Sequence, residues 1–269
     1  MGSVLLTSAE VARILGVTPG SVKRWADQGV LPRAPAAGPK QRFDRSEVDR
    51  LQRRRDAAGG SGDQFVDALL GEPDAVALQA ALLAERARQG AWWRLAESLA
   101  RALCEIGARW ESGILSILEE HVASERLARA LARVAESLPP RPGAPRLLLV
   151  TAEGDDHTLG LSLAEVCARE YGWQVLWAGR VTPLAEVVAV VAAGGAEAVA
   201  VSASPVCTPG DLLAQAERLG AICRAGEVAL ALCGRGPWPE WLPYGDRLCD
   251  FASLRDWMDA IERARAFTR

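Results

Sequence analysis

The spacing of apolar residues changes part-way along the chain. From about residue 145 onward, short runs of consecutive apolar residues alternate with longer segments in which apolar residues recur every three or four positions. The first pattern is typical of buried parallel strands and the second of amphipathic helices. The predicted strands are 146–151, 174–178, 198–202, 228–232 and a short one near 248, and the predicted helices are 159–171, 183–193, 210–225 and 254–265. These steps predict a flavodoxin-like (Rossmann-like) five-stranded parallel sheet, covered by helices on both faces, over residues 145–269.

Upstream of this region the apolar spacing is helical throughout. Residues 74–140 are rich in Ala, Leu and Arg and predict a bundle of three or four helices, with Gly90 and Gly113 as interruptions. Trp92 and Trp93 are adjacent, so on a helix at most one of them can point into the core. Four prolines in residues 138–145 end the bundle. Before the bundle, a Gly/Ser-rich stretch predicts a flexible linker over residues 58–73.

The first 57 residues predict a compact helical module. Thr7 and Ser8 lie where a helix N-cap is expected, and Gly16 ends the apolar repeat that follows. Pro19 begins a second helix that carries Lys23 and Arg24, and Trp25 shares its apolar face. A third, charged helix is predicted over residues 44–55. Two helices joined by a short turn predict a helix-turn-helix.

Charge separates this module from the rest of the chain. Residues 1–57 hold 11 Lys and Arg against six Asp and Glu, whereas residues 58–269 hold 20 against 28. A basic module joined to an acidic remainder favours a polyanionic partner for residues 1–57. A basic helix that is merely exposed to solvent would give the same excess of Lys and Arg. With 49% apolar residues, no long uncharged apolar run and no basic-then-apolar N-terminus, the chain predicts a globular cytoplasmic protein without membrane contact. Six cysteines without a C-x-x-C pair predict reduced core thiols.

The N-terminal module resembles the winged helix-turn-helix of MerR-type transcription regulators along about 50 residues, from Leu5 to Leu51. The resemblance implies a second helix in the major groove of DNA and a wing that grips the backbone. The residues it assigns to DNA are Ser21, Lys23, Arg24, Arg33, Lys40, Gln41 and Arg42. A helical hairpin that contacts another protein is the alternative.

The loop after the first strand of the C-terminal region carries the clearest chemistry. It places His157, one of only two histidines in the chain, two residues after Asp155. The carboxylate could accept a proton from one ring nitrogen and leave the other free to bind a metal. One histidine cannot hold a bare metal ion, so the metal must bring other ligands with it, as a tetrapyrrole-like cofactor does.

This loop resembles the Asp-x-His-x-x-Gly signature of cobalamin-binding domains, with Asp155, His157 and Gly160 in register. The resemblance implies that His157 is the lower axial ligand of cobalt. Two further elements fit a channel for the nucleotide tail: Ser202 and Ser204 after the third strand, and Gly234 and Gly236 after the fourth. Ser204 and Cys233 depart from the usual residues of these elements, but both are small.

In order, these modules resemble the CarH/CarA family of cobalamin-dependent photoreceptor repressors over essentially the whole chain. Trp110, followed after nine residues by Glu120 and His121, matches the family motif that covers the upper face of the corrin. An uninterrupted helix would place Trp110 and His121 on one face, about 16 Å apart. A bundle helix with a core tryptophan and a capping histidine is the alternative.

The resemblance implies a non-enzymatic repressor that binds adenosylcobalamin in the dark, forms a homo-oligomer such as a tetramer, and occupies operator DNA until light cleaves the Co–C bond. Glu111 stands where light-sensing members commonly carry a histidine that ligates cobalt after photolysis, so the photoproduct should lack a second histidine ligand. Methylcobalamin as the bound form, a light-independent cobalamin-level sensor, a regulator without cofactor and a corrinoid methyl carrier are the alternatives.

Overall fold

The structure is a computed structural model that describes residues 5–15, 19–27, 29–34, 41–58, 61–71, 74–111, 115–242 and 244–268. Packing divides the chain into two compact units. The first comprises Met1–Leu78 and Ser98–Leu127, and the second comprises Gln79–Glu97 and Ala128–Arg269. The boundary therefore passes through three helices of the segment 74–140, which was expected to be a separate bundle.

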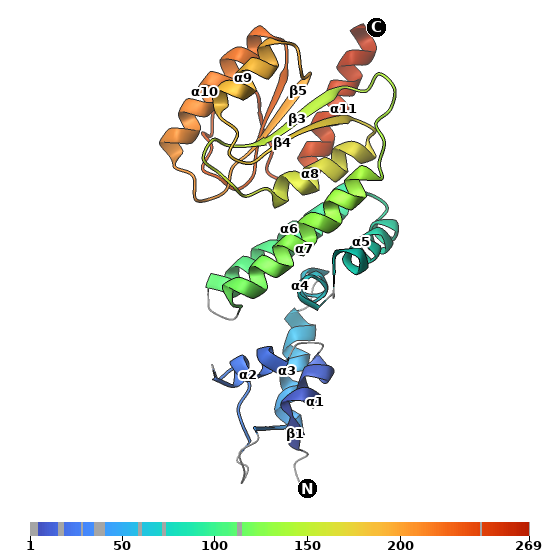
Figure 1. Cartoon of the computed structure of the whole chain (residues 1–269), viewed down its shortest axis with the longest axis vertical. Coiled ribbons are helices and arrows are strands. Elements are labelled where there is room, and N and C mark those ends of the chain that lie inside the picture. Colours follow the sequence, from blue (N-terminus) through green and yellow to red (C-terminus); the bar gives the residue numbers. More distant parts are fainter. Residues whose placement is uncertain are drawn as a thin grey trace. The chain divides into compact units, whose positions relative to one another are not determined.

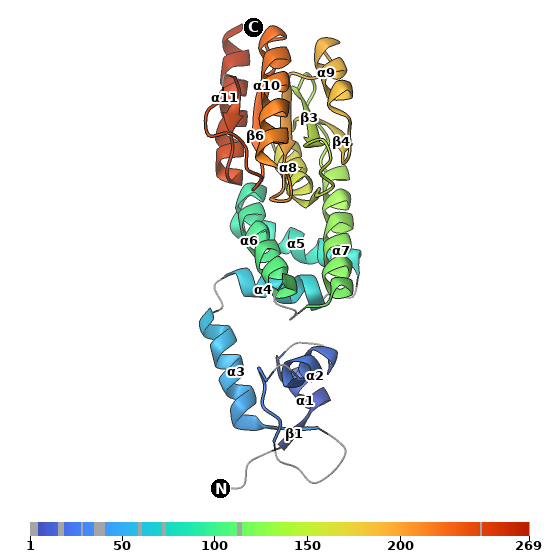
Figure 2. The same cartoon turned by 90° about the vertical axis from the view of Figure 1, so that its left-hand side faces the viewer.

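A five-stranded parallel sheet is the centre of the second unit. Its strands are β3 (Arg146–Thr151), β4 (Gln174–Gly179), β5 (Ala198–Ser202), β6 (Ala229–Cys233) and β7 (Asp246–Arg247), in the order β4-β3-β5-β6-β7. Helices α8 (Leu159–Glu170), α9 (Leu184–Ala192), α10 (Pro209–Ala225) and α11 (Phe251–Thr268) cover it, with α8 packed on α11 and α9 on α10 (Figure 1; Figure 2). This is the flavodoxin-like order, and the predicted fold class is confirmed.

The strands form where the apolar runs predicted them because both faces of the sheet are covered. Every residue of β5 is buried, and in β3 only Arg146 is partly exposed. The edge strand β4 differs, since Leu176 and Trp177 are about 40% and 38% exposed. Carboxyl ends of β3, β5 and β6 lie in register, with Thr151 paired to Ser202 and Ser202 to Cys233.

Three helices occupy the segment that predicted three or four: α5 (Ala75–Gln89), α6 (Trp92–Glu111) and α7 (Ile117–Glu136). Gly90, with φ +83°, lies between the first two, as expected. Trp92 is 2% exposed, whereas Trp93 is half-buried beneath the guanidinium groups of Arg94 and Arg255. Gly113 lies outside the described residues.

Trp110 and His121 lie on two different helices, so the spacing that an uninterrupted helix would give them does not apply. Helix α6 ends at Glu111, and a new helix starts at Ile117. Ser116 explains the start, because its hydroxyl accepts from the Glu119 amide while the Glu119 carboxylate accepts from the Ser116 amide at 2.9 Å. This reciprocal capping box begins a helix rather than continuing one.

The linker predicted over residues 58–73 contains a helix, α4 (Ser61–Gly71). Its Gly/Ser-rich first residues indicated a coil, but Phe65, Val66, Leu69 and Leu70 follow at helical spacing, and Val66 and Leu69 are buried. Burial of these side chains overrides the weak helix propensity of the first turn.

The N-terminal module contains α1 (Ser8–Leu15), α2 (Pro19–Asp27) and α3 (Arg45–Ala58), with an antiparallel pair formed by β1 (Leu5–Thr7) and β2 (Arg42–Asp44). Its core includes Val11, Val22, Leu31, Phe43 and Val48, with Trp25 packed against it. The Glu10 carboxylate accepts hydrogen bonds from the Thr7 amide at 2.7 Å and the Thr7 hydroxyl at 2.8 Å, so this cap is a capping box as well.

All six cysteines are free thiols, as predicted, but Cys104 and Cys249 are exposed and are not core residues. Within the described part of the chain, no helix combines the length and apolar content that a membrane crossing needs.

Candidate functional site

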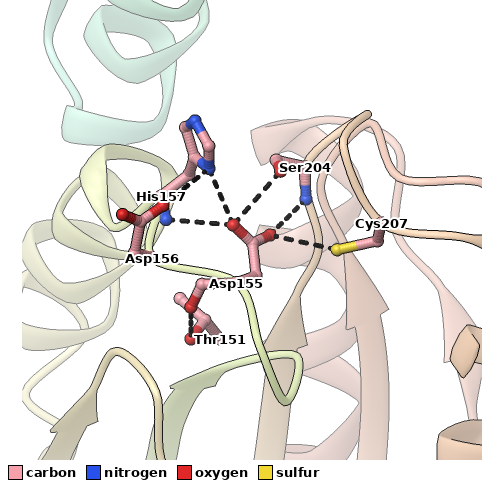
Figure 3. Close-up of polar contacts among 6 residues, drawn as sticks. All are labelled: Thr151, Asp155, Asp156, His157, Ser204 and Cys207. Atoms are coloured by element: carbon pink, nitrogen blue, oxygen red, sulfur yellow. Dashed lines mark hydrogen bonds and ion pairs between the residues drawn. The ribbon is translucent and has the colours of Figure 1, made fainter.

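The loop after β3 folds back on its own strand. The Asp155 amide donates to the Ala152 carbonyl at 2.9 Å, and the Thr151 hydroxyl donates to the Asp155 carbonyl at 2.6 Å. Gly154 has φ +85°, a conformation that glycine adopts without strain. This turn places the Asp155 side chain beneath the loop and the His157 side chain above it (Figure 3).

Asp155 and His157 form the pair that the sequence predicts. The Asp155 side chain is fully buried, and its Oδ1 lies 2.7 Å from His157 Nδ1 and 3.0 Å from the His157 amide. The His157 side chain is 59% exposed, and its Nε2 faces away from the carboxylate (Figure 3). An ionised Asp155 fixes the proton on Nδ1, so the lone pair of Nε2 remains available to a metal.

Two residues from the loop after β5 complete the surroundings of Asp155. The Ser204 amide and hydroxyl donate to the carboxylate at 2.6 and 3.1 Å, and the Cys207 thiol donates at 3.5 Å (Figure 3). Burial raises the pKa of Asp155, but the hydrogen bonds from His157 and Ser204 outweigh it, so the pKa lies below its ordinary value. Burial and the Asp155 charge raise the pKa of Cys207, which therefore remains a protonated donor.

Sequence reasoning missed these two roles. We expected Ser204 to line the tail channel, and the structure turns its donors toward Asp155 instead. Cys207 was not predicted at all, and its only sequence signal is its place five residues beyond the end of β5.

Asp156 makes a third potential metal ligand next to Asp155 and His157, with ligand atoms within 4.8 Å of one another. Its Oδ1 lies 3.3 Å from His157 Nδ1, and its side chain is 70% exposed. The Asp155 oxygens already accept five hydrogen bonds, which leaves them poor ligands. Of the Asp155–His157 pair, the atom left to coordinate a metal is therefore His157 Nε2.

Small residues meet beside this loop at the ends of β5 and β6. A Cβ on Gly234 would lie 2.3 Å from the Ala203 carbonyl oxygen and 2.9 Å from Ser202 Oγ, and a Cβ on Gly236 would lie 2.6 Å from the Ala203 Cβ. A Cβ on Gly160 would lie 3.7 Å from the same Ser202 hydroxyl, for which the described residues provide no hydrogen-bond partner. The loops after β5 and β6 therefore approach each other closely, and a residue with a Cβ at position 234 or 236 would collide with Ala203. Glycine is required at these two positions for the loops to pack in this way.

The residues expected above a corrin lie at the end of α6 and the start of α7. Trp110 is 44% exposed and Glu111 is also exposed. The exposed His121 ring lies 3.5 Å from the Glu120 carboxylate, which also accepts from the Ser124 hydroxyl at 2.6 Å. Ile117, Leu118 and Val122 are exposed on the same helix. A half-exposed tryptophan and this apolar surface suit contact with a large flat ligand.

The residues of the helix-turn-helix module that are expected to contact DNA differ in exposure and in pairing. Lys23 on α2 is exposed, whereas Arg33 forms an ion pair with Asp27 at the end of the same helix. Gln41 and Arg42 are half-buried at the β1–β2 pair. Lys40 lies outside the described residues, as do the side chains of Ser21 and Arg24.

Known proteins resemble this chain at the level of a family model and of two individual relatives. Residues 5–56 match the family model of the helix-turn-helix domain. The HTH-type transcriptional repressor CarA of Myxococcus xanthus is 36% identical over 83 residues, which cover 31% of this chain and 27% of CarA. The HTH-type transcriptional repressor CarH of the same organism is 32% identical over 87 residues, or 32% of this chain and 29% of CarH. The chain is similar to the CarA and CarH repressors. It matches less than a third of the length of either relative.

The C-terminal fold also has a counterpart among solved structures. The monomethylamine corrinoid protein of Methanosarcina barkeri superposes with a TM-score of 0.55 at 18% identity, over 73% of this chain and 95% of that chain. The chain therefore shares its fold with this solved structure.

Proposed function

We propose that this chain is a cobalamin-binding transcription regulator in which the state of the cofactor controls DNA binding. The observation that carries the proposal is the His157–Asp155 pair, an exposed imidazole held by a buried carboxylate at the carboxyl end of the sheet. The same chain carries a helix-turn-helix domain at residues 5–56. Similarity to two transcriptional repressors supports the combination.

In this proposal His157 Nε2 is the lower axial ligand of cobalt, and Asp155 fixes its tautomer and orientation. Gly160, Ser202, Gly234 and Gly236 line the place of the nucleotide tail. We assign contact with the opposite face of the cofactor to Trp110, Glu111, Glu120 and His121. Adenosylcobalamin, the form we favour over methylcobalamin, supplies a Co–C bond that visible light cleaves.

DNA binding is assigned to the basic N-terminal module. Lys23 contacts phosphate or base edges from α2, and Ser21, Arg24, Arg33, Lys40, Gln41 and Arg42 complete the interface. A homo-oligomer brings several such modules to one operator, so a ligand that favours assembly also raises DNA affinity. We propose that the unlit adenosylcobalamin state is the assembled repressor and that light reverses assembly.

The test is a gel shift of the full-length protein on its operator with adenosylcobalamin, in darkness and after green light, with absorption spectra recorded alongside. We expect a pink complex that binds DNA in the dark and releases it after illumination. A His157→Ala variant, with Asp156→Asn as the matched control in the same loop, should lose the base-off spectrum with histidine bound. An unchanged spectrum in His157→Ala would refute the assignment.

Glu111 favours a second candidate, a regulator that responds to cobalamin level and not to light. Without a histidine at this position, residue 111 provides no imidazole to bind cobalt in the photolysed state. Identical DNA binding before and after green light, combined with dependence on added cofactor, would select this candidate. The M. barkeri fold similarity gives a third candidate, a corrinoid methyl carrier, which the basic module at residues 1–57 disfavours.

A further inference from the structure

Arg247 holds the end of strand β6 from the side opposite Ser202. It lies on β7, paired with Leu232 of β6. Its Nη1 donates to the carbonyls of Leu232 at 2.9 Å and Leu248 at 2.8 Å, and its Nη2 donates to the Gly234 carbonyl at 2.5 Å. One guanidinium thus joins two adjacent strand ends and the first glycine of the loop.

These bonds are stronger than ordinary contacts between a side chain and the backbone. A hydrogen bond with a charged donor is about twice as strong as a neutral one, and the planar guanidinium fixes the directions of its donors. The Leu232 carbonyl also accepts from the Leu248 amide at 3.0 Å, so there Arg247 adds a second donor, whereas at Leu248 and Gly234 it bonds carbonyls that lie beyond the ends of their strands. Arg247 therefore determines where the Gly234 backbone lies.

The other side of the same loop is held by backbone contacts. The Gly236 amide donates to the Ala203 carbonyl at 2.8 Å, and the Trp238 indole donates to the Cys233 carbonyl at 2.7 Å. Gly234 has φ +82° and faces Ser202 Oγ and the Ala203 backbone. Gly234 is therefore packed against the loop after β5 on one side, and its carbonyl is bonded to Arg247 on the other.

We propose that Arg247 is a positioning residue for the nucleotide-tail channel, and that it makes corrinoid affinity depend on the presence of the tail. The proposal rests on the proposed function, since it concerns the same cofactor. Arg247 acts through the Gly234 backbone and leaves the His157 side of the site unchanged. A purely structural arginine would instead affect every corrinoid equally.

The test compares hydroxocobalamin with cobinamide, a corrinoid without the nucleotide tail, in absorption titrations of the full-length protein. Arg247→Met keeps the aliphatic stem and removes the donors. We expect it to lower hydroxocobalamin affinity by about tenfold or more, the size of one lost hydrogen bond with a charged donor, and cobinamide affinity by less than about twofold. Arg247→Lys keeps the charge but not the planar guanidinium. Its hydroxocobalamin affinity should lie between those of Arg247→Met and the native protein.

Arg218→Met, an exposed arginine on α10, is the control for the change in net charge and should leave both affinities unchanged. Hydrogen exchange of residues 233–236 without any corrinoid gives a second readout, and it should be faster in Arg247→Met than in the control. Circular dichroism and thermal melting show whether the variant is folded; if it is not, Arg247→Lys carries the comparison.

The outcomes separate the two proposals. Selective loss of hydroxocobalamin binding with faster exchange supports the role of Arg247. Equal loss of both corrinoids, or no loss of either, overturns that role and leaves cobalamin binding intact. If the native protein takes up neither corrinoid, the proposed function itself fails, and the role of Arg247 fails with it.

Discussion

Replacing Asp155 by asparagine is the most informative single change at the candidate site. The substitution preserves the shape of the side chain and removes one charge and one acceptor. Asp155 Oδ2 accepts from the Ser204 amide at 2.6 Å and from the Cys207 thiol at 3.5 Å, and Oδ1 accepts from His157. If the asparagine oxygen stays on His157, its NH₂ group faces two donors.

The expected magnitude follows from these contacts. A buried donor left without an acceptor costs about 1–3 kcal/mol, and the Ser204 amide becomes such a donor. We therefore expect Asp155→Asn to lower the free energy of unfolding by about 1–3 kcal/mol in the absence of cofactor. Loss of the partner that orients a metal-binding histidine typically costs 10–100-fold in affinity, so cobalamin affinity should fall by about that factor.

The matched control is Asp156→Asn. This neighbour removes the same charge from the same loop, and its Oδ1 lies 3.3 Å from His157 Nδ1, but it is 70% exposed. We expect it to change stability by less than about 0.5 kcal/mol. Urea unfolding and absorption titration with hydroxocobalamin measure the two effects. Equal effects of the two variants would show that burial and the contacts to Ser204 and Cys207 do not matter, and would refute the reasoning.

Three further changes test other parts of the molecule. Gly234→Ala should destabilise by about 2 kcal/mol or more in urea unfolding, because it combines a left-handed backbone with a clash against the Ala203 carbonyl; an unchanged midpoint would contradict this geometry. Thr7→Ala should cost the N-terminal module about 1 kcal/mol, measured by thermal melting. The Thr7 hydrogen bonds lower the pKa of Glu10, so the native cap contributes stability above the ordinary carboxyl pKa that is lost as pH falls, and Thr7→Ala should reduce this acid sensitivity. Lys23→Gln should weaken binding to all DNA sequences alike and reduce the slope of log affinity against log salt by about 1; selective loss on one sequence would instead indicate base contact.

The fold of the C-terminal region could be predicted because its strands are buried on both faces. Consecutive apolar residues such as those of β3 and β5 have few other interpretations, and the strands lie within one or two residues of their predicted positions. Helix α4 could not be predicted from composition, since its first turn holds Ser61 and Gly62. What stabilises it is burial of Val66 and Leu69, a property of tertiary structure.

An interruption between Trp110 and His121 was expected from Gly113, and the two residues do lie on separate helices. The start of the second helix was not predicted, although Ser116 and Glu119 have the spacing of a capping box, and this box begins α7 at Ile117.

The contacts of Ser204 and Cys207 with Asp155 join residues about 50 positions apart, and no local pattern encodes them. They depend on the register of the sheet. Because Thr151 pairs with Ser202 and Ser202 with Cys233, the loops after β3, β5 and β6 begin at one level. A slip of one residue would turn each side chain of a strand to the opposite face. The sequence can therefore identify each loop of the site, but its chemistry arises only when the apolar runs of β3, β5 and β6 fix their register.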